Sequence, residues 1–227
     1  PDRSTFADAE KIFRKYKLFD KLPNSIVQHI QMGIEGKISE TPKKGNSIFQ
    51  KTFNLIIGSN VLAMKGAEKK AKEFGFNALF LSSFIEGEAR EVARLHTAIA
   101  KEIISTGNPI PSPACVISGG ETTVTVKGNG LGGRNLEFAL VAGMEIEGLD
   151  NVVILSAGTD GTDGPTDAAG GVVDGITVKR AKRLGLNPQD YLQRNDSYHF
   201  FSQLNDLIIT GPTRTNVMDI RLILVSL

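Results

Sequence analysis

Residues 151–167 of the chain read NVVILSAGTDGTDGPTD. The first part, up to Ser156, is an aliphatic run without polar alternation, which is typical of a strand buried on both faces. The second part is a loop of Gly, Asp and Thr that follows this strand directly. Open α/β sheets bind their ligands outside the carboxyl ends of such strands. The stretch therefore predicts both the fold class and the end of the sheet that carries the site.

Upstream of this stretch, short apolar runs alternate with longer segments of helical periodicity. Strands are expected over residues 53–57 and 77–81, and helices over residues 61–74 and 86–106. Residues Gly58-Ser59-Asn60 lie between the first strand and its helix, where they are expected to cap the helix. Strands that alternate with helices predict parallel neighbours joined by helical crossovers.

The central part of the chain adds a glycine pair between two further apolar runs. Residues 114–118 and 122–127 flank Gly119-Gly120, which predicts a tight hairpin because glycine tolerates positive φ. A helix is expected over 134–147, and the Gly/Asp/Thr loop is expected to continue to Gly171. The remaining elements are short helices around 177–184, 188–193 and 197–203, and strands over 206–209 and 220–225. The sequence thus predicts an α/β fold with a mixed, largely parallel sheet and helices on both faces, a Rossmann-like three-layer arrangement.

A short helical segment precedes this fold. Ser4-Thr5 is expected to cap a helix that reaches Tyr16, and a second helix is expected over residues 24–35. A weak linker follows, from Gly36 to Asn46. We therefore expect residues 1–45 to be a lead-in from a preceding domain and residues 46–227 to form the α/β domain. Since the sequence starts Pro1-Asp2 without an initiator Met, we expect a piece of a longer polypeptide.

Composition excludes several classes of protein. With 41% hydrophobic residues the chain has enough apolar content for a sizeable core, so it is not a disordered chain. A net charge of +1 without long basic runs argues against a nucleic-acid partner. No apolar run approaches the length of a membrane span. The single cysteine, Cys115, excludes an internal disulfide framework and fits a reducing compartment, so a cytoplasmic protein is expected.

The first candidate site is the glycine-rich loop at residues 128–135, which reads GNGLGGRN. It follows a strand and opens a helix, so the amides of Gly130, Gly132 and Gly133 can approach an anion at the helix N-terminus. Arg134 adds a fork suited to phosphate or carboxylate. An arginine in the first turn opposes the helix dipole and needs another reason to be there. The alternative is a flexible connector between two elements.

The same loop matches the dinucleotide pattern G-x-G-x-x-G, but its surroundings do not. A dinucleotide fold needs an acidic residue about 20 positions further on, at the end of the next strand. Val153 stands at that place, in the middle of a strand. The preceding strand is also expected to belong to a hairpin and not to a βαβ unit. The pattern alone therefore does not predict a nucleotide-cofactor site.

The second candidate is the loop that follows the buried strand. Asp160 and Asp163 offer oxygen ligands to a hard cation such as Mg²⁺, and Asp160 is also placed to accept a proton from an attacking hydroxyl. The alternative is a string of Gly-Asp turns. A third loop, residues 210–216, carries Thr213 and Asn216 and is expected either to line the same cleft or to be a plain turn. The charged run at 86–91 is interpreted as an ordinary helix start.

These motifs together resemble a known family. Residues 119–126, 132–135 with Glu137, 158–167 and 210–216 resemble the MOFRL domain, which forms the C-terminal part of the glycerate 2-kinase family. Residues 1–9 and 86–92 resemble other segments from the second half of these kinases, so the resemblance covers nearly the whole chain. The chain departs from the family pattern at Leu136, where Gln is frequent, at Arg214, where Gly is usual, and at Met218, where Asn is common.

The resemblance implies ATP-dependent transfer of phosphate to the 2-hydroxyl of D-glycerate, giving 2-phosphoglycerate, with Mg²⁺ as cofactor. It also implies an active site in a cleft between two domains, of which the N-terminal one, the source of a lysine, is absent here. Arg134 and Asp160 would be catalytic, with Asp160 and Asp163 as metal ligands. The residues expected to bind phosphate or substrate are Gly130, Gly132, Gly133, Asn135, Thr213 and Asn216. An NAD(P)H-dependent hydroxypyruvate reductase and a non-catalytic anion-binding domain are the alternatives, and a homodimer stays open.

Overall fold

The computed structural model describes residues 1–226. By internal contacts the chain divides into two units, residues 1–56 and an α/β unit that begins at Ile57. The expected domain boundary after residue 45 stays a prediction. Between the two positions lie a short 3-10 helix, η2 (Ser47–Lys51), and the start of an extended segment.

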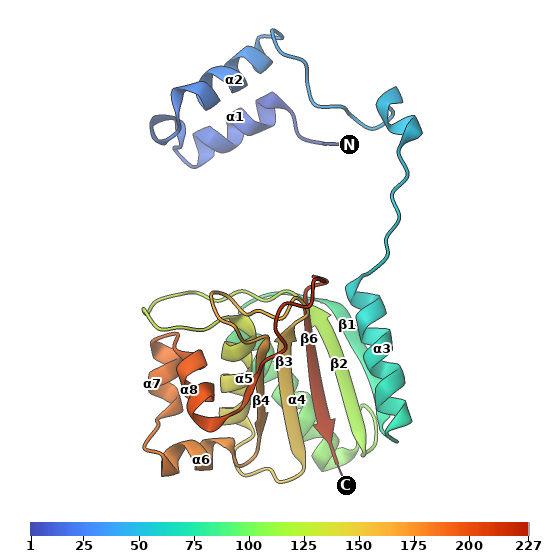
Figure 1. Ribbon diagram of the computed structural model, residues 1–227, viewed down its shortest axis with the longest axis vertical. Coiled ribbons are helices and arrows are strands. Elements are labelled where there is room, and N and C mark those ends of the chain that lie inside the picture. Colours follow the sequence, from blue (N-terminus) through green and yellow to red (C-terminus); the bar gives the residue numbers. More distant parts are fainter. Residues whose placement is uncertain (227) are drawn as a thin grey trace. The chain divides into compact units, whose positions relative to one another are not determined.

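The first unit is a pair of helices, α1 (Phe6–Lys15) and α2 (Asn24–Ile34), joined through the 3-10 helix η1 (Phe19–Lys21) (Figure 1). Both helices were expected from the sequence. Thr5 caps α1, and its hydroxyl and the Asp8 carboxylate satisfy each other's backbone amides in a capping box. Among the described residues of both helices, none is fully buried. This unit therefore has no dry core of its own.

The expectation of a strand at residues 53–57 is wrong. These residues are extended but pair with no strand of the described chain, and the side chains of Phe53 and Ile57 are 86% and 88% exposed. An apolar run of this kind becomes a strand only when a neighbour accepts its backbone hydrogen bonds. The expected helix cap is present: the Ser59 hydroxyl accepts a hydrogen bond from the Leu62 amide at the start of α3 (Asn60–Glu73).

The second unit contains a six-stranded mixed sheet, which confirms the predicted α/β class (Figure 1). Its order is β1-β2-β6-β3-β4-β5, with bounds β1 Asn77–Ile85, β2 Ala114–Gly120, β3 Val152–Gly158, β4 Gly170–Asp174, β5 Leu207–Ile208 and β6 Asp219–Val225. Only β1 and β2 are parallel neighbours. The other neighbouring pairs are antiparallel: β6 enters between β2 and β3 in the opposite direction, and β4 runs opposite to both β3 and β5.

The expectation of a hairpin around Gly119-Gly120 is also wrong. Both edges of β2 are occupied, by β1 and by β6, so no place is left for residues 122–127 beside it. These residues run instead along the start of α4 (Ala89–Thr106), where Thr123 and Glu88 form an isolated bridge. Strand β4 was not predicted: the expected loop ended at Gly171, within the strand, and two of the five strand residues are glycines, which are poor strand formers.

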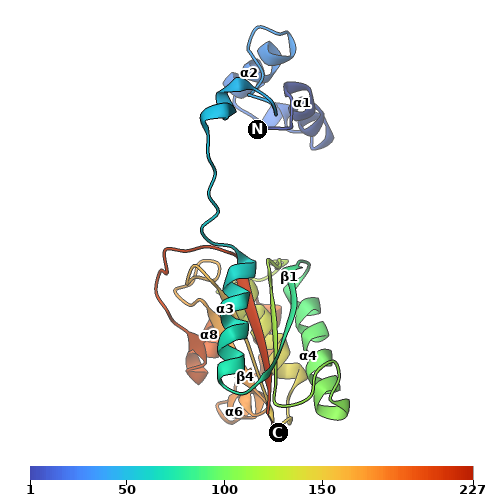
Figure 2. The same ribbon diagram turned by 90° about the vertical axis from the view of Figure 1, so that its right-hand side faces the viewer.

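Helices cover both faces of the sheet, as predicted (Figure 2). Helix α3 packs on one face, where Met64 and Ala71 meet Cys115 and Ile117 of β2. Helices α4 and α5 (Arg134–Glu145) cover the other face and bury the larger core, which includes Phe138. Three short helices, α6 (Thr177–Arg183), α7 (Pro188–Gln193) and α8 (Ser197–Leu204), pack beside α5.

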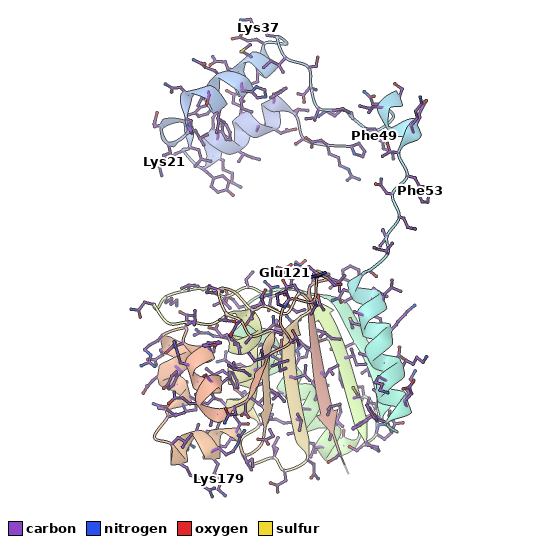
Figure 3. The ribbon with its side chains drawn as sticks, viewed as in Figure 1. Lys21, Lys37, Phe49, Phe53, Glu121 and Lys179 are labelled. Carbon is purple, nitrogen blue, oxygen red and sulfur yellow. The ribbon has the colours of Figure 1, made fainter. Side chains whose placement is uncertain are left out.

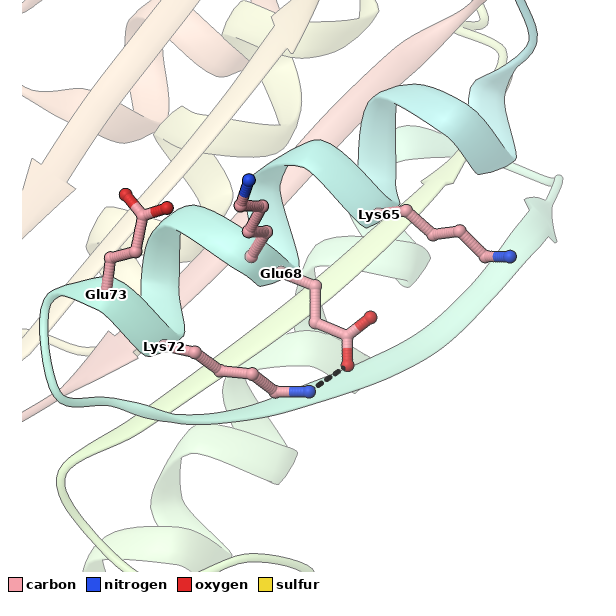
Figure 4. A pocket seen from close by; sticks show the side chains of 5 residues that line it. Lys65, Glu68, Lys72 and Glu73 are labelled. Carbon is pink, nitrogen blue, oxygen red and sulfur yellow. Dashed lines mark hydrogen bonds and ion pairs between the residues drawn. The ribbon is translucent and has the colours of Figure 1, made fainter.

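The outer face of α3 is a row of charged side chains (Figure 4). Lys72 and Glu68 form an i,i+4 ion pair at 2.6 Å, and Lys70 pairs with Glu73 at 3.0 Å. Exposed pairs of this kind contribute about 0.3–0.5 kcal/mol each to a helix. This face is therefore a solvated helix surface. None of the described helices combines the length and the apolar character needed to cross a membrane.

Candidate functional site

Strand register places three loops at one end of the sheet. Asp219, the first residue of β6, lies opposite Gly120 at the end of β2 and opposite Gly158 at the end of β3. The segments that continue from these ends therefore start beside one another, at the loop-bearing end of the sheet in Figure 1. Figure 3 labels Glu121, the residue after β2, at this end. The sequence predicted this end of the sheet from the β3 loop alone.

Arg134, the first residue of α5, is held by Asp219 in a two-pronged ion pair. Its Nε and Nη2 donate to the two Asp219 oxygens at 2.8 and 2.9 Å. The carboxylate is fully buried and raises the pKa of Arg134, so this guanidinium stays charged. The remaining nitrogen, Nη1, lies 3.1 Å from the exposed Glu121 carboxylate. One edge of the guanidinium is thus fixed, and the other faces the loops.

A second arginine shares the same carboxylate. Arg221 is fully buried, and its Nη2 donates to Asp219 at 3.1 Å and to the Thr122 hydroxyl at 3.0 Å. Its Nε and Nη1 are buried without a hydrogen-bond partner among the described residues. The guanidinium lies over the Phe138 ring at 5.4 Å, and burial lowers its pKa. Two cationic groups, one buried and one partly exposed, therefore share one buried anion.

Asp163 closes the N-terminus of α5. Its two oxygens accept from the amides of Asn135 and Leu136 at 3.0 and 2.8 Å, and its side chain is almost completely buried. The Asn135 side chain bridges the Asp163 and Asp219 carboxylates and accepts from the Ser156 hydroxyl. The first-turn amides that a bound anion would use are thus already bonded within the protein.

Burial raises the pKa of Asp163 to about 6, although the amides of Leu136 and Asn135 act in the opposite direction. In the unfolded chain this carboxyl ionises near its usual pKa of 3.8. Between these two values the folded protein binds more protons than the unfolded chain, so the stability that Asp163 contributes falls as pH rises.

We expect this fall to be visible against Asp163→Asn, which cannot titrate. The free energy of unfolding of the wild type minus that of the variant should decrease by on the order of 1 kcal/mol per pH unit between about pH 4 and pH 6, and level off above. Urea titrations of both proteins at several pH values measure this difference. A difference that is independent of pH would contradict the assignment.

The glycine-rich loop packs against residues 194–197. A Cβ on Gly130 would lie 2.4 Å from the Asp196 side chain, and one on Gly132 would lie 2.4 Å from the Ser197 hydroxyl. The Gly130 amide donates to the Arg194 carbonyl at 2.9 Å. Within the described part of the chain, the amides of Gly132 and Gly133 have no acceptor. Of the three predicted amides, only these two are available to an anion.

The structure brings Asp160, Thr213 and Asn216 together, as expected for neighbouring loops. The Thr213 amide donates to the Asp160 carbonyl at 3.1 Å, and the Asn216 amide group lies 3.4 Å from the Asp160 carboxylate. The second Asp160 oxygen accepts from the Thr162 amide. Across residues 1–226, no three His, Cys, Asp or Glu side chains converge as a metal site would require.

A cleft of about 890 Å³ lies on the other side of Arg134. Its walls include Gly130, Gly132, Gly133 and Arg134 together with the segment that follows β2. Asp160, Thr213 and Asn216 are not among its lining residues. The predicted site residues therefore form two groups: Arg134 with the three glycines on the wall of this cleft, and Asp160 with Thr213 and Asn216 on the adjoining loops.

Residues 114–219, which contain most of this arrangement, including Arg134, Asp163 and Asp219, match the MOFRL family. These residues form a MOFRL domain. It is 45% identical over 97% of its length to the D-glycerate 2-kinase of Thermotoga maritima, and 38% identical over 99% to the glycerate 2-kinase of Pyrococcus horikoshii. The crystal structure of the Thermotoga maritima glycerate kinase superposes with a TM-score of 0.85, at 44% identity, and covers 99% of this chain.

Each of these relatives is about twice as long as the matched segment. The chain spans 50% of both kinase sequences and 51% of the Thermotoga maritima structure. A putative hydroxypyruvate reductase of Agrobacterium vitis is 37% identical over 99% of this chain and is covered to 50% of its own length.

Two of the positions that depart from the expected MOFRL pattern have a left-handed backbone. Arg214 and Met218 have φ values of 59° and 70°, in the left-handed region that favours the Gly and Asn of the family. Leu136 lies fully buried in the main core, where its side chain packs with apolar neighbours. These positions support the loops and the core of the MOFRL domain.

Two residues at the centre of the site, Asp219 and Arg221, were missed by sequence reasoning. Both belong to a strand that was expected only for its apolar residues. A signal was present: they stand two positions apart, so they lie on the same face of a strand whose other residues are aliphatic. An acid and a base on one face of a buried strand indicate a paired internal charge.

Proposed function

We propose that this chain is one half of a glycerate 2-kinase, which transfers phosphate from ATP to the 2-hydroxyl of D-glycerate and yields 2-phosphoglycerate. The observation that carries the proposal is Arg134, whose guanidinium is fixed on one side by buried Asp219 and lies on the wall of the cleft. The names of the Thermotoga maritima and Pyrococcus horikoshii relatives support the reaction and the use of ATP.

Phosphoryl transfer depends mainly on positioning and on neutralising the charge of the phosphoryl oxygens. Arg134 Nη1 would exchange the exposed Glu121 carboxylate for an anionic oxygen of ATP or glycerate. The amides of Gly132 and Gly133 would donate to the same anion. Because two of its nitrogens are already bound to Asp219, Arg134 loses little side-chain freedom when the anion binds.

Mg²⁺ is proposed as a companion of ATP, and the donor set allows only part of the expected site. Asp163 does not fit, because its oxygens are engaged by the α5 amides in the buried interior. Asp160 fits as a single ligand: it is half-buried and lies beside Asn216. Kinase sites often hold Mg²⁺ with one or two carboxylates and the phosphates of the substrate, and the ion then offsets phosphate charge. Asp160 is alternatively the proton acceptor for the glycerate hydroxyl.

Asp160→Asn is the direct test of this carboxylate. The substitution keeps the size of the side chain and the contact with Thr162, and removes the charge. We expect kcat for glycerate phosphorylation by the complete polypeptide to fall by about 10²–10³-fold. Asp167→Asn, an exposed residue of the same loop, is the control and should stay within about twofold. Normal kcat in the Asp160 variant would remove Asp160 from the reaction.

The proposal includes a partner domain from the same polypeptide, since the matched kinases are about twice as long. The α1–α2 unit exposes apolar side chains such as Ile12 and Tyr16 and has no buried residue in its described helices. We propose that residues 1–45 belong structurally with that other half, and that this chain alone is inactive. The lone, buried Cys115 supports a reducing compartment such as the cytoplasm.

Hydroxypyruvate reduction is the second candidate, because the Agrobacterium vitis relative is named a putative hydroxypyruvate reductase. The two activities separate in one experiment. The complete polypeptide is supplied with hydroxypyruvate and NAD(P)H, and in parallel with D-glycerate and ATP. Oxidation of NAD(P)H without phosphorylation of glycerate would replace the kinase proposal.

A further inference from the structure

The glycine-rich loop is tied along its length to the turn between α7 and α8. Besides the bond from Gly130 to Arg194, the Leu131 amide donates to the Asp196 carboxylate at 2.9 Å. The Tyr198 amide donates back to the Leu131 carbonyl, also at 2.9 Å. The position of the loop is thus set by a segment that follows it by more than sixty residues.

Asn195 is the centre of this contact. It is buried, has a φ of 54°, and its Oδ1 accepts from the amides of both Lys127 and Gly128, at 2.8 and 2.9 Å. Its Nδ2 donates in the other direction, to Glu137 Oε2 at 3.0 Å. One side chain therefore joins the loop backbone to helix α5.

Glu137 is held in turn by Arg90 from α4. Arg90 Nε and Nη2 donate to the two Glu137 oxygens at 2.6 and 3.2 Å, and Nη2 also donates to the Leu192 carbonyl at 3.0 Å. Glu137 is only 2% exposed, and Arg90 is partly exposed, so the carboxylate end of this ion pair is the buried one. Glu137 and Asn195 line the cleft, whereas Arg90 is not among the lining residues. The charged run at 86–91 is therefore more than a helix start.

We propose that Arg90, Glu137 and Asn195 form a positioning relay that sets the glycine-rich loop, so that the amides of Gly132 and Gly133 are aimed into the cleft. Arg90 fixes the Glu137 carboxylate, the carboxylate orients the Asn195 amide group, and the amide oxygen holds the loop backbone. None of the three residues reacts. The identity of the bound anion rests on the proposed kinase function, but the positioning of the loop does not.

Asn195→Gly tests the relay. Glycine keeps the left-handed backbone without strain and removes both side-chain contacts. Asn205→Gly is the matched control, because Asn205 has nearly the same φ, 57°, but is exposed and lies outside the relay. Hydrogen exchange of the amides of Lys127 and Gly128 is measured in the full chain. We expect it to accelerate about tenfold or more in Asn195→Gly and to stay unchanged in Asn205→Gly.

Steady-state kinetics of the complete polypeptide give the second readout. If the amides of Gly132 and Gly133 are displaced, KM should rise about tenfold for the substrate whose anion they bind. The value of kcat should change less. A merely structural role would lower the amount of active enzyme, and therefore kcat, at unchanged KM. Asn195→Asp, which faces Glu137 with a second carboxylate, should show the same defect. Pairing it with Glu137→Gln removes the repulsion and should restore KM in part: the Gln amide can donate to the new carboxylate, but its oxygen alone is left to accept from Arg90.

Unchanged loop exchange in Asn195→Gly would overturn the relay, and so would a loss of kcat at constant KM. If the wild-type polypeptide phosphorylates no glycerate, the proposed function fails, and the exchange measurement still decides on the relay by itself.

Discussion

Replacement of Arg134 by alanine is expected to lower kcat/KM for ATP-dependent glycerate phosphorylation by about a thousandfold in the complete polypeptide. The guanidinium is the one cation among the residues that line the cleft, and Asp219 holds it in place through two hydrogen bonds. Alanine removes the charge and leaves nothing to replace it. The helix N-terminus cannot compensate, because Asp163 already occupies the amides of Asn135 and Leu136.

Two further variants make this result specific. Arg134→Lys keeps a positive charge but cannot bind Asp219 and an anion with separate edges of a planar group, so it should recover only a small part of the activity. Arg94→Ala removes a half-exposed arginine on α4 that pairs with Glu91 at the surface, and should remain within about twofold. Activity of Arg134→Ala close to that of the wild type would exclude Arg134 from the reaction.

Asp219→Asn is expected to cost about 3–5 kcal/mol of the free energy of unfolding of the α/β unit. The carboxylate is the shared counter-ion of Arg134 and Arg221, and Arg221 is completely buried. Asparagine keeps the shape but leaves the buried Arg221 without its charge partner, and leaves Arg134 with only the exposed Glu121 carboxylate. Its amide group also presents a donor to a guanidinium that can only donate.

Urea unfolding followed by far-ultraviolet circular dichroism measures this cost. Asp150→Asn serves as the control, because Asp150 is exposed at the start of β3, and it should change the free energy of unfolding by less than about 0.5 kcal/mol. The kinase activity of Asp219→Asn should be lost at temperatures where the protein is still folded, since Arg134 is no longer oriented. A variant as stable as the wild type would show that the buried arginines do not depend on this carboxylate.

Local sequence patterns predicted the helices well, because each one carries its own periodicity and caps. The pairing of strands was harder to predict, since it depends on distant segments. Residues 53–57 and 122–127 have strand-like sequences but find no edge to pair with. Strand β4 is the reverse case. Two of its five residues are glycines, which disfavour a strand, but pairing with the neighbouring strands holds it extended. The mixed sheet was predicted, but the antiparallel entry of β6 was not.

In the candidate site, too, local patterns point to some residues, whereas contacts between distant segments decide the others. Arg134 was identified from the sequence because a first-turn arginine conflicts with the helix dipole. Its partner Asp219 lies 85 positions away in sequence, so no local pattern connects the two. Asp163 carries the residue type of a metal ligand, and only burial and the two α5 amides reveal that it caps a helix. The functions of Asp160, Thr213 and Asn216 stay predictions.

The position of β6 in the sheet has a consequence for synthesis of the protein. This strand follows the other five in sequence, yet it lies between β2 and β3 and carries Asp219. During synthesis, the pair β1–β2 and the group β3–β4–β5 therefore cannot join into one sheet until residues 219–225 have left the ribosome. Until then both halves expose an unpaired strand edge, which is a hazard for association with other chains. A nascent chain that stalls before Asp219 would be a substrate for chaperones, and its Arg134 would lack the buried carboxylate that orients it.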